Sequence, residues 1–312
     1  MLRYGAPAGG HWYGDRQLGA SIVVYGTEEQ KREFLPKIRS GELFIALGMS
    51  EPEAGSDLAS LQTRAVEDGD DFIIDGQKTW TGGAHHSDYI YLLVRTDPEA
   101  PKHRGISEFL VDLKLPGITI NPIVDMSGRH HVNEVFFDGV RVPKKMMVGE
   151  KNRGWYQSVV QLDYERSGME RLMSNYPLFE KLVAYAKETK RDGKPLTKAP
   201  LIRNRLAELF IEFEVGRLLV YRVAWMLDQE IVPNYESSMG KAYCTDFQQR
   251  LADAAVHILG LGGQLMPDSK WAPLDGLVAI GYLLAPRYTL QGGVSEILRN
   301  IIALRGLELP AR

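Results

Sequence analysis

Residues 134–143, EVFFDGVRVP, are rich in β-branched and aromatic side chains and end at a proline. This composition is typical of a β-strand, and residues 71–76, 89–94 and 109–113 share it. Glycine, proline and aspartate separate these runs at short spacing, and no segment between them is long enough for a crossover helix. We therefore expect residues 41–152 to form a mostly antiparallel β-sandwich or barrel.

The segments on both sides of this β region have helical patterns instead. Residues 1–40 are predicted to be a helical remnant, in which Thr27 and Gln30 form a capping box and Pro36 ends or bends the helix. Residues 153–312 are predicted to be a helical bundle. Its helices are expected over residues 155–174, 176–190, 201–229 and 236–259, followed by a last helix capped by Ser295. The expected fold class is α+β with three domains: 1–40, 41–152 and 153–312.

The composition excludes several classes of protein. The 312 residues include 37 Lys and Arg against 40 Asp and Glu, and 44% are hydrophobic, which excludes extended disorder and disfavours a phosphate-driven nucleic-acid binder. Cys244 is the single cysteine, so neither an internal disulfide nor a cysteine cluster for zinc is predicted. No apolar run reaches the ~18 residues of a transmembrane helix. Residues 1–7 lack the apolar core of a signal peptide, and we expect a cytoplasmic protein.

Two segments are candidates for a binding site. Residues 47–57, LGMSEPEAGSD, place small and hydroxyl-bearing residues together, so that backbone amides can approach an anion. This segment has neither the Gly-Lys-Ser/Thr ending of a P-loop nor the G-x-G-x-x-G of a dinucleotide fold, and an ordinary turn is the alternative. Residues 76–84, GQKTWTGGA, place Trp80 beside glycines, where the indole can stack on a planar ring or lie in the core.

His85 and His86 follow the second segment. Adjacent residues on a strand point to opposite faces, so the two imidazoles make a poor metal pair. We interpret them as surface polar residues and predict no metal site.

Four blocks of the sequence resemble the acyl-CoA dehydrogenase family. They are SEPEAGSD at residues 50–57, DGQKTW at 75–80, VFFDGVRVP at 135–143 and GGVSEILR at 292–299. The blocks occur in the family's order, and the resemblance extends from about Gly26 to the C-terminus. It implies an N-terminal helical domain, of which residues 1–40 cover only the end, then a central β domain and a C-terminal four-helix domain.

The resemblance also implies a chemistry. Members of this family use FAD to convert an acyl-CoA thioester to the 2-enoyl-CoA, and they pass the electrons to an electron-transferring flavoprotein. A homo- or hetero-oligomer, either a dimer or a tetramer, is implied as well. By the same resemblance, the residues implied to bind the cofactor are Leu47, Met49, Ser50, Gly55, Ser56, Trp80, Thr81, Ser295 and Glu296.

The catalytic base is the point at which family members differ. Many carry a glutamate at the position of Gly292, which has no side chain to take a proton. Isovaleryl-type members carry it instead in a Leu-Asp-x-Glu-Arg pattern, which residues 162–166 match as LDYER. The resemblance therefore implies Glu165 as the base, with a solvated helix residue as the alternative. Glu170 is the nearest rival, but on one continuous helix it would face another direction.

Other roles stay open at this point. The resemblance implies substrate contacts at Asp163, Arg166, Gly292 and Gly293, with surface salt bridging as the alternative for the two charged residues. Gly292 leaves room for a branched or bulky acyl chain. Departures at Gly82, at residues 190–194 and at residues 257–263 leave some flavin contacts in question. The alternatives are a flavin oxidase of another small substrate and a non-catalytic partner subunit of a heteromeric acyl-CoA dehydrogenase.

Overall fold

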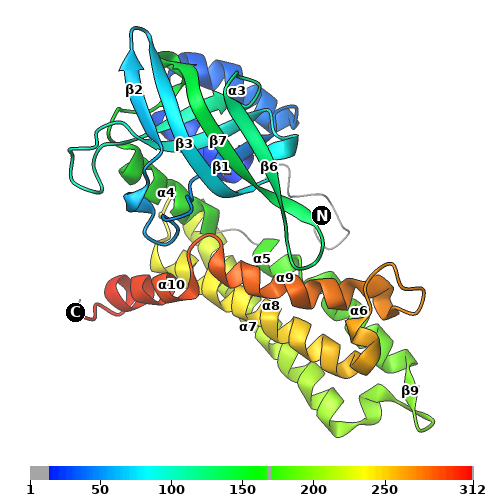
Figure 1. The fold of residues 1–312 in the computed structure, drawn as a ribbon. Coiled ribbons are helices and arrows are strands. Elements are labelled where there is room, and N and C mark those ends of the chain that lie inside the picture. Colours follow the sequence, from blue (N-terminus) through cyan, green and yellow to red (C-terminus); the bar gives the residue numbers. More distant parts are fainter. Residues whose placement is uncertain (1–13, 167–169, 311–312) are drawn as a thin grey trace. The chain divides into compact units, whose positions relative to one another are not determined.

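The structure is a computed structural model that describes residues 14–166 and 170–310. Contacts divide this part of the chain into two compact units with a boundary between Glu165 and Arg166. We call residues 14–165 the β unit and the residues from 166 onward the helical unit. Figure 1 shows the long strands within the β unit and the longest helices within the helical unit.

The β unit begins with helices. These are η2 (Gly14–Leu18), α2 (Gly19–Tyr25) and α3 (Glu28–Ser40). The capping box at the start of α3 is confirmed, because Gln30 N donates to Thr27 Oγ1 at 3.2 Å and Thr27 N donates to Gln30 Oε1 at 3.0 Å. Pro36 does not end α3, which continues to Ser40. The missing proline amide removes only one bond near the end of the helix, and Gly41, with φ of 76°, terminates it instead.

An eight-stranded sheet follows these helices. Its strands are β1 (Ile45–Gly48), β2 (Arg64–Asp68), β3 (Asp71–Gly82), β4 (Tyr89–Arg95), β5 (Ile106–Asp112), β6 (Ile118–Val124), β7 (His130–Pro143) and β8 (Met147–Val148). Their order is β6-β7-β3-β2-β4-β5-β8, and β1 pairs with β4. Most pairs are antiparallel as predicted, but β1 and β2 each pair with β4 in parallel. The four predicted runs correspond to β3, β4, β5 and β7.

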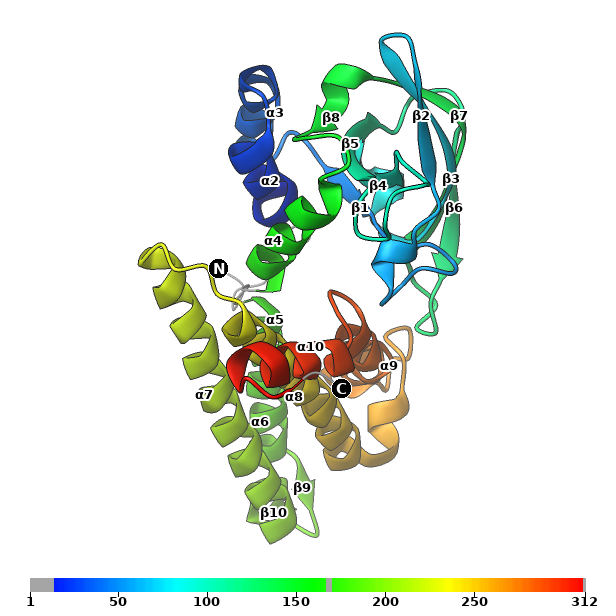
Figure 2. The same ribbon diagram turned by 90° about the vertical axis from the view of Figure 1, so that its left-hand side faces the viewer.

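Strand β4 is apolar along its whole length because both of its faces are buried. Tyr91 and Leu93 pack in a core with side chains of α2 and α3. Ile90, Leu92 and Val94 alternate with them and pack in a second core with side chains of β3 and β7. Figure 2 shows α2 and α3 on one side of β4 and β5, and β3 and β7 on the other.

Short elements complete the β unit. They are the 3₁₀ turns η3 (Leu58–Ser60), η4 (Ala84–His86) and η5 (Lys144–Met146), and helix α4 (Gly154–Arg166), whose last residue belongs to the helical unit. The prediction placed His85 and His86 on a strand, and this is wrong, because they lie in η4. The β3 strand ends at Gly82, and Gly83, with φ of 66°, turns the chain into η4.

The helical unit is built around α8. Its elements are α5 (Glu170–Met173), α6 (Tyr176–Glu188), the β9–β10 hairpin (Lys190–Arg191 and Lys194–Pro195), η6 (Leu196–Lys198), α7 (Pro200–Asp228), α8 (Tyr235–Leu259), η7 (Gly260–Gln264), η8 (Pro273–Gly276), α9 (Leu277–Leu290), α10 (Ser295–Ile301) and η9 (Ile302–Gly306). Phe247 and Leu251 of α8 share a core with Leu209 and Phe213 of α7. Figure 1 shows α6, α7, α8 and α9 alongside one another as a bundle.

Most predicted helices lie where the sequence placed them. The segment over residues 155–174 is described as α4 and α5, and residues 167–169 between them lie outside the described residues. The prediction that Ser295 caps the last helix is wrong. Val294 is the N-cap residue, and Ser295 is the first residue of α10 with no side-chain bond to the helix end.

The α+β class, with a central β domain followed by a C-terminal helical domain, is confirmed. Among the helices described here, none combines the length and the apolar character that crossing a membrane requires. The domain boundaries at residues 40 and 152 stay predictions.

Candidate active site

Strand β3 holds the segment that follows β1. Lys78 is completely buried, and its Nζ donates to the Met49 carbonyl at 3.1 Å and to Glu51 Oε1 at 2.8 Å. The next residue along β3, Thr79, donates its backbone N–H to the Ser50 carbonyl at 2.9 Å. Two consecutive carbonyls of the predicted cofactor segment are therefore bound by two consecutive residues of β3.

Glu51 extends this network to a third segment. Its carboxylate accepts the backbone amides of Gln62 and Thr63 at 2.6 and 2.9 Å in addition to the Lys78 bond. Burial raises the pKa of Glu51, but the charge and hydrogen bond of Lys78 outweigh it, so that the pKa lies below its ordinary value. For Lys78, burial disfavours the charged ammonium and lowers its pKa to about 8, although the Glu51 charge raises it.

Glu51 and Lys78 lie in the family blocks at residues 50–57 and 75–80, but the sequence predicts no role for either. Both are charged residues at buried positions next to the predicted cofactor residues. Each residue lies in a block that also contains predicted flavin contacts. This proximity was the only sequence feature that could have pointed to a role for them. Their pairing depends on a contact across 27 residues, which no local pattern discloses.

A β-bulge lies directly after Lys78. Lys78 is opposite Val135 and Thr81 is opposite Asn133, so three steps along β3 match two steps along β7. Within the bulge Trp80 adopts a left-handed backbone, with φ of 57°, and 64% of the residue is exposed. The sequence left a core position open as the alternative for Trp80, and this exposure rules it out. The exposed indole, on a strained backbone, presents a flat apolar face for a ligand.

Thr81 follows Trp80 and is buried, with 1% exposed. Its hydroxyl oxygen has no hydrogen-bond partner within the part of the chain that the structure describes. A buried hydroxyl without a partner costs free energy, so this hydroxyl is available to hydrogen-bond a group bound beside Trp80.

The remaining predicted cofactor residues of the β unit differ in exposure. Leu47 is half-buried in β1 and Met49 is buried, whereas Ser50 is half-buried in the segment held by β3. Gly55 and Ser56 are exposed in the loop before η3, and a side chain at Gly55 would meet open space. Backbone amides of this loop are therefore accessible to an anionic group.

His85 and His86 do not behave as two independent surface residues. Their rings lie 3.9 Å apart between centroids, and His85 stacks on His130 at 3.8 Å. Across residues 14–166 and 170–310, no group of three or more histidine, cysteine, aspartate or glutamate side chains has a geometry that could hold a metal ion.

A buried carboxyl anchors the start of α4 to the sheet. Glu108 of β5 accepts hydrogen bonds from Gln157 Nε2 at 2.7 Å and from Ser158 Oγ at 2.6 Å. Burial raises the pKa of Glu108 to about 7, although the Ser158 and Gln157 bonds lower it. This network fixes the helix that carries the predicted base.

Glu165 lies near the end of α4, and its backbone belongs to the same unit as Met49, Trp80 and Thr81. The side chains of Asp163, Glu165 and Arg166 lie outside what the structure describes. Glu170 is the first residue of α5. The expectation that Glu170 faces another direction than Glu165 assumed one continuous helix through residues 167–169, which lie outside the described residues, so it stays a prediction.

The last family block lies in the helical unit. Gly292 and Gly293 have φ of 67° and 95°, which strongly favour glycine. The buried Lys241 of α8 donates to the Gly293 carbonyl at 2.7 Å. Ser295 has a buried hydroxyl without a partner in the described chain, and Glu296 is exposed in the first turn of α10, where the helix dipole favours a carboxylate.

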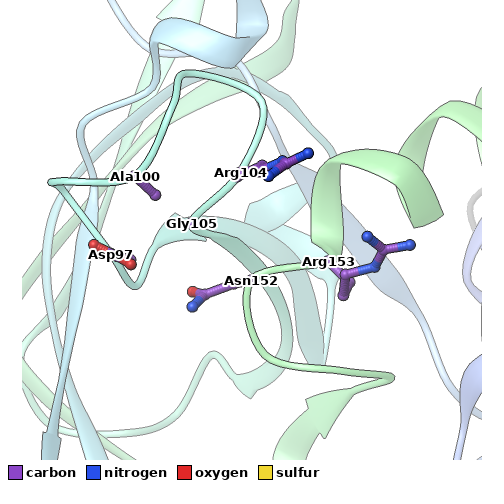
Figure 3. Close-up of a pocket in the computed structure, with 6 residues that line it drawn as sticks. All are labelled: Asp97, Ala100, Arg104, Gly105, Asn152 and Arg153. Atoms are coloured by element: carbon purple, nitrogen blue, oxygen red, sulfur yellow. The ribbon is translucent and has the colours of Figure 1, made fainter.

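A surface hollow of about 430 Å³ lies on the β unit, outside the predicted cofactor residues. Its lining comes from the loop after β4 and the turn before α4: Asp97, Ala100, Arg104, Gly105, Asn152 and Arg153. Figure 3 shows Asp97 and Arg153 on opposite sides of it. None of these residues is among the predicted site residues, so the hollow is not part of the predicted flavin site.

Comparison with known families identifies both parts of the chain. Residues 46–140 match the acyl-CoA dehydrogenase middle domain, and residues 152–307 match the acyl-CoA dehydrogenase C-terminal domain. The chain belongs to the acyl-CoA dehydrogenase family. It is therefore related to oxidoreductases, as the four sequence blocks predict. Among its relatives is the acyl-CoA dehydrogenase FadE29 of Mycobacterium tuberculosis, which is 37% identical over 298 residues, 94% of this chain and 75% of the relative.

Solved acyl-CoA dehydrogenase structures share the fold. The protein described as the Tcur3481-Tcur3483 steroid ACAD G363A variant superposes with a TM-score of 0.91 and 38% identity, over 97% of this chain and 78% of the other. The ChsE4-ChsE5 complex of Mycobacterium tuberculosis superposes with a TM-score of 0.90 and 33% identity, over 99% and 79%. Similarity of this extent supports the assignment of both units to the family.

Proposed function

We propose that this member of the acyl-CoA dehydrogenase family binds FAD and oxidises an acyl-CoA thioester to the 2-enoyl-CoA, with Glu165 as the base. The observation that carries the proposal lies at the β3 bulge. There the exposed Trp80 and the Thr81 hydroxyl, which has no partner among the described residues, follow directly on Lys78 and Thr79, the two residues that hold the backbone of Met49 and Ser50 in place.

The residues present fit a flavin. An isoalloxazine offers a flat apolar face for Trp80 and a polar edge for a hydroxyl donor such as Thr81. The exposed loop at Gly55 and Ser56 offers amides and a hydroxyl to a pyrophosphate. The cofactor roles of Leu47, Ser295 and Glu296 stay predictions. When bound, FAD supplies the acceptor for the hydride that leaves the β-carbon.

The chain itself handles the proton. Glu165 takes the α-proton of the thioester, and a carboxylate is a weak base toward a C–H bond. A site that excludes water raises the pKa of this carboxyl, and hydrogen bonds to the thioester oxygen lower the pKa of the α-carbon. Trp80 and Met49 are the apolar groups proposed to exclude water. Asp163, Arg166, Gly292 and Gly293 stay predicted substrate contacts.

We propose a branched or polycyclic acyl group as the substrate class. Gly292 has no side chain at the position where many family members carry a glutamate, and one structural relative is described as a steroid acyl-CoA dehydrogenase. Electrons are proposed to leave through an electron-transferring flavoprotein. Release of hydrogen peroxide without an added acceptor would instead favour the oxidase alternative.

Association with further chains is part of the proposal. The ChsE4-ChsE5 relative is a complex of two different proteins. In this chain, Ile211, Leu218 and Trp225 recur at a seven-residue spacing on α7 and are 61%, 65% and 59% exposed. Apolar residues repeated along one helix face are typical of an interface, which supports a dimer or tetramer, either homo- or hetero-oligomeric.

The test is an anaerobic titration of the FAD-loaded protein with straight-chain, branched and steroid-type acyl-CoA thioesters. We expect the oxidised flavin band to bleach in the wild type, most readily with a branched or steroid-type thioester. The Glu165→Gln variant should bind the thioester without bleaching, and Glu170→Gln, a matched acid on the neighbouring helix, should behave as the wild type. Purified protein that folds but takes up no FAD would favour the non-catalytic subunit instead.

A further inference from the structure

At the bulge in β3, the Thr81 backbone carbonyl accepts a hydrogen bond from a side chain of the neighbouring strand. A bulge disrupts ladder hydrogen bonds at the extra residue, here between Lys78 and Thr81. Asn133, directly opposite on β7, donates from its side-chain Nδ2 to the Thr81 carbonyl at 2.9 Å. Asn133 is completely buried, so this bond is protected from water.

Two histidines fix the orientation of that amide. His85 Nδ1 donates to Asn133 Oδ1 at 3.1 Å, and His130 Nε2 donates to the same oxygen at 2.7 Å. Because Nδ2 of Asn133 is used as the donor to Thr81, its Oδ1 must be the acceptor, and each of these two ring nitrogens carries a proton. A flipped amide would instead place its oxygen against the Thr81 carbonyl oxygen, two acceptors with no proton between them.

We propose that Asn133 is a positioning residue for the flavin site: oriented by His85 and His130, its amide holds the backbone of Thr81 in place. The inference rests on the proposed function, because it takes Trp80 and Thr81 to be cofactor contacts. Movement of the Thr81 backbone carries with it the Thr81 hydroxyl and the preceding indole. Displacement of about 1 Å at such a contact can reduce catalysis about 100-fold.

The histidines make this arrangement sensitive to pH. Their rings stack at 3.8 Å, so both cannot carry a charge without repulsion. Burial, followed by the charges of His130 and His86, lowers the pKa of His85 from its ordinary value, while the Asn133 bond raises it.

The neighbours of His85 define which charges act on it. His86 comes from η4, and His130 and His131 come from β7. Strands β1 and β6 also contact η4 but carry no titratable side chain. Asp125 lies in the turn before β7. Burial raises its pKa, but hydrogen bonds from Ser127 and the Arg129 amide, and last the charge of His131, bring the pKa below its ordinary value. The described charges that face His85 directly are therefore imidazoles.

The direction of the pH effect follows from linkage. The pKa of His85 is lower in the folded chain than its unfolded value of about 6.5. As the pH falls below about 6.5, His85 therefore binds a proton more readily in the unfolded chain than in the folded chain. The stabilisation by the neutral cluster is therefore complete above about pH 6.5 and is lost as the pH falls toward the folded-state value. A charged His85 still donates to Asn133, so we expect acid to act through repulsion between the stacked rings, which shifts Asn133 and with it Thr81.

Two double variants separate hydrogen bonding from titration. His85→Asn with His130→Gln keeps an amide N–H near each ring nitrogen but removes both ionisable groups. His85→Ala with His130→Ala removes the donors. His257→Ala, an exposed histidine of the helical unit, controls for loss of an imidazole elsewhere. FAD affinity and hydrogen exchange of the amides of residues 79–84 are measured for each protein at about pH 8 and about pH 5.5, on either side of the ordinary histidine pKa.

At the higher pH, we expect the double-alanine variant to bind FAD about tenfold more weakly than the wild type, the equivalent of one lost hydrogen bond, and to exchange faster over residues 79–84. The Asn/Gln variant and His257→Ala should match the wild type. At the lower pH, the wild type should weaken and exchange faster, and the Asn/Gln variant should not change between the two pH values.

Wild-type affinity and exchange in the double-alanine variant would overturn the proposal. An equal loss of FAD affinity in the Asn/Gln and the double-alanine variants would overturn it too, because hydrogen-bond donors to Asn133 would then not determine the affinity. A wild type that binds no FAD at either pH contradicts the proposed function instead. The exchange measurement needs no cofactor and still decides whether Asn133 holds Thr81.

Discussion

Two loops that carry predicted site residues are each held by a buried lysine, one in each unit, and the means differ. In the β unit, Lys78 binds the Met49 carbonyl and forms an ion pair with Glu51, which in turn binds two further amides. In the helical unit, Lys241 binds the Gly293 carbonyl of a loop that also needs two glycines with positive φ.

The two family motifs therefore shape their loops in different ways. The β-unit motif acts through charged side chains that join backbone segments far apart in the sequence. The helical-unit motif acts through the absence of side chains, because residues 292–293 adopt a backbone that other residues resist. The three substitutions that follow test whether this difference is real.

The largest effect is expected for Lys78→Met. It leaves the Glu51 carboxylate buried without its ion-pair partner, and breaking a buried pair costs about 3–5 kcal/mol of unfolding free energy. Urea unfolding followed by circular dichroism measures this loss, and FAD uptake should fall with it. Lys144→Met, which breaks an exposed pair with Glu67, should leave the free energy of unfolding nearly unchanged, because solvent screens an exposed pair.

The double variant Lys78→Met with Glu51→Gln sharpens the result. It removes both charges, so it should be more stable than Lys78→Met alone. If it is less stable, the ion pair is not the source of the loss, and the β-unit side of the comparison fails.

A smaller loss is expected for Lys241→Met. The substitution removes the donor to the part-buried Gly293 carbonyl, and loss of a hydrogen bond at such a position costs about 1–2 kcal/mol. The same unfolding assay applies, with Lys187→Met, an exposed lysine of α6, as the matched control. A loss as large as that of Lys78→Met would erase the distinction between the two loops.

The smallest effect on stability is expected for Gly292→Ala. A φ of 67° costs a residue with a Cβ about 1 kcal/mol. Gly193→Ala is the control, because Gly193 has φ of 76° and open space around it in the β9–β10 hairpin. Both variants should lose similar stability, but only Gly292→Ala should lose turnover of acyl-CoA. Equal turnover in the two would remove Gly292 from the predicted substrate site.

Local sequence patterns predicted much of the fold. The runs that became β3, β4, β5 and β7 are long and rich in β-branched or aromatic residues, and the long helices have a clear period. Strands β1 and β8 are four and two residues long, too short for a pattern, and β1 pairs in parallel with β4 about forty residues away. Such pairing is decided by tertiary packing.

The candidate site was predictable in part. Trp80 and Thr81 could be named from the family blocks, and the structure adds the exposure of one and the unpartnered hydroxyl of the other. Lys78 and Asn133 could not be assigned roles, because a polar residue in a strand is expected at the surface. Their burial depends on partners that lie 27 and 52 residues away in the chain.

The measurement that tests the central claim most directly is the single-turnover rate of flavin bleaching by an acyl-CoA thioester, followed without oxygen in a stopped-flow instrument. Loss of a general base typically costs 10²–10⁴-fold, so Glu165→Gln should bleach about 1,000-fold more slowly than the wild type, and Glu170→Gln at close to the wild-type rate. A Glu165→Gln rate within a few fold of the wild type, or a loss confined to Glu170→Gln, would contradict the assignment of the base.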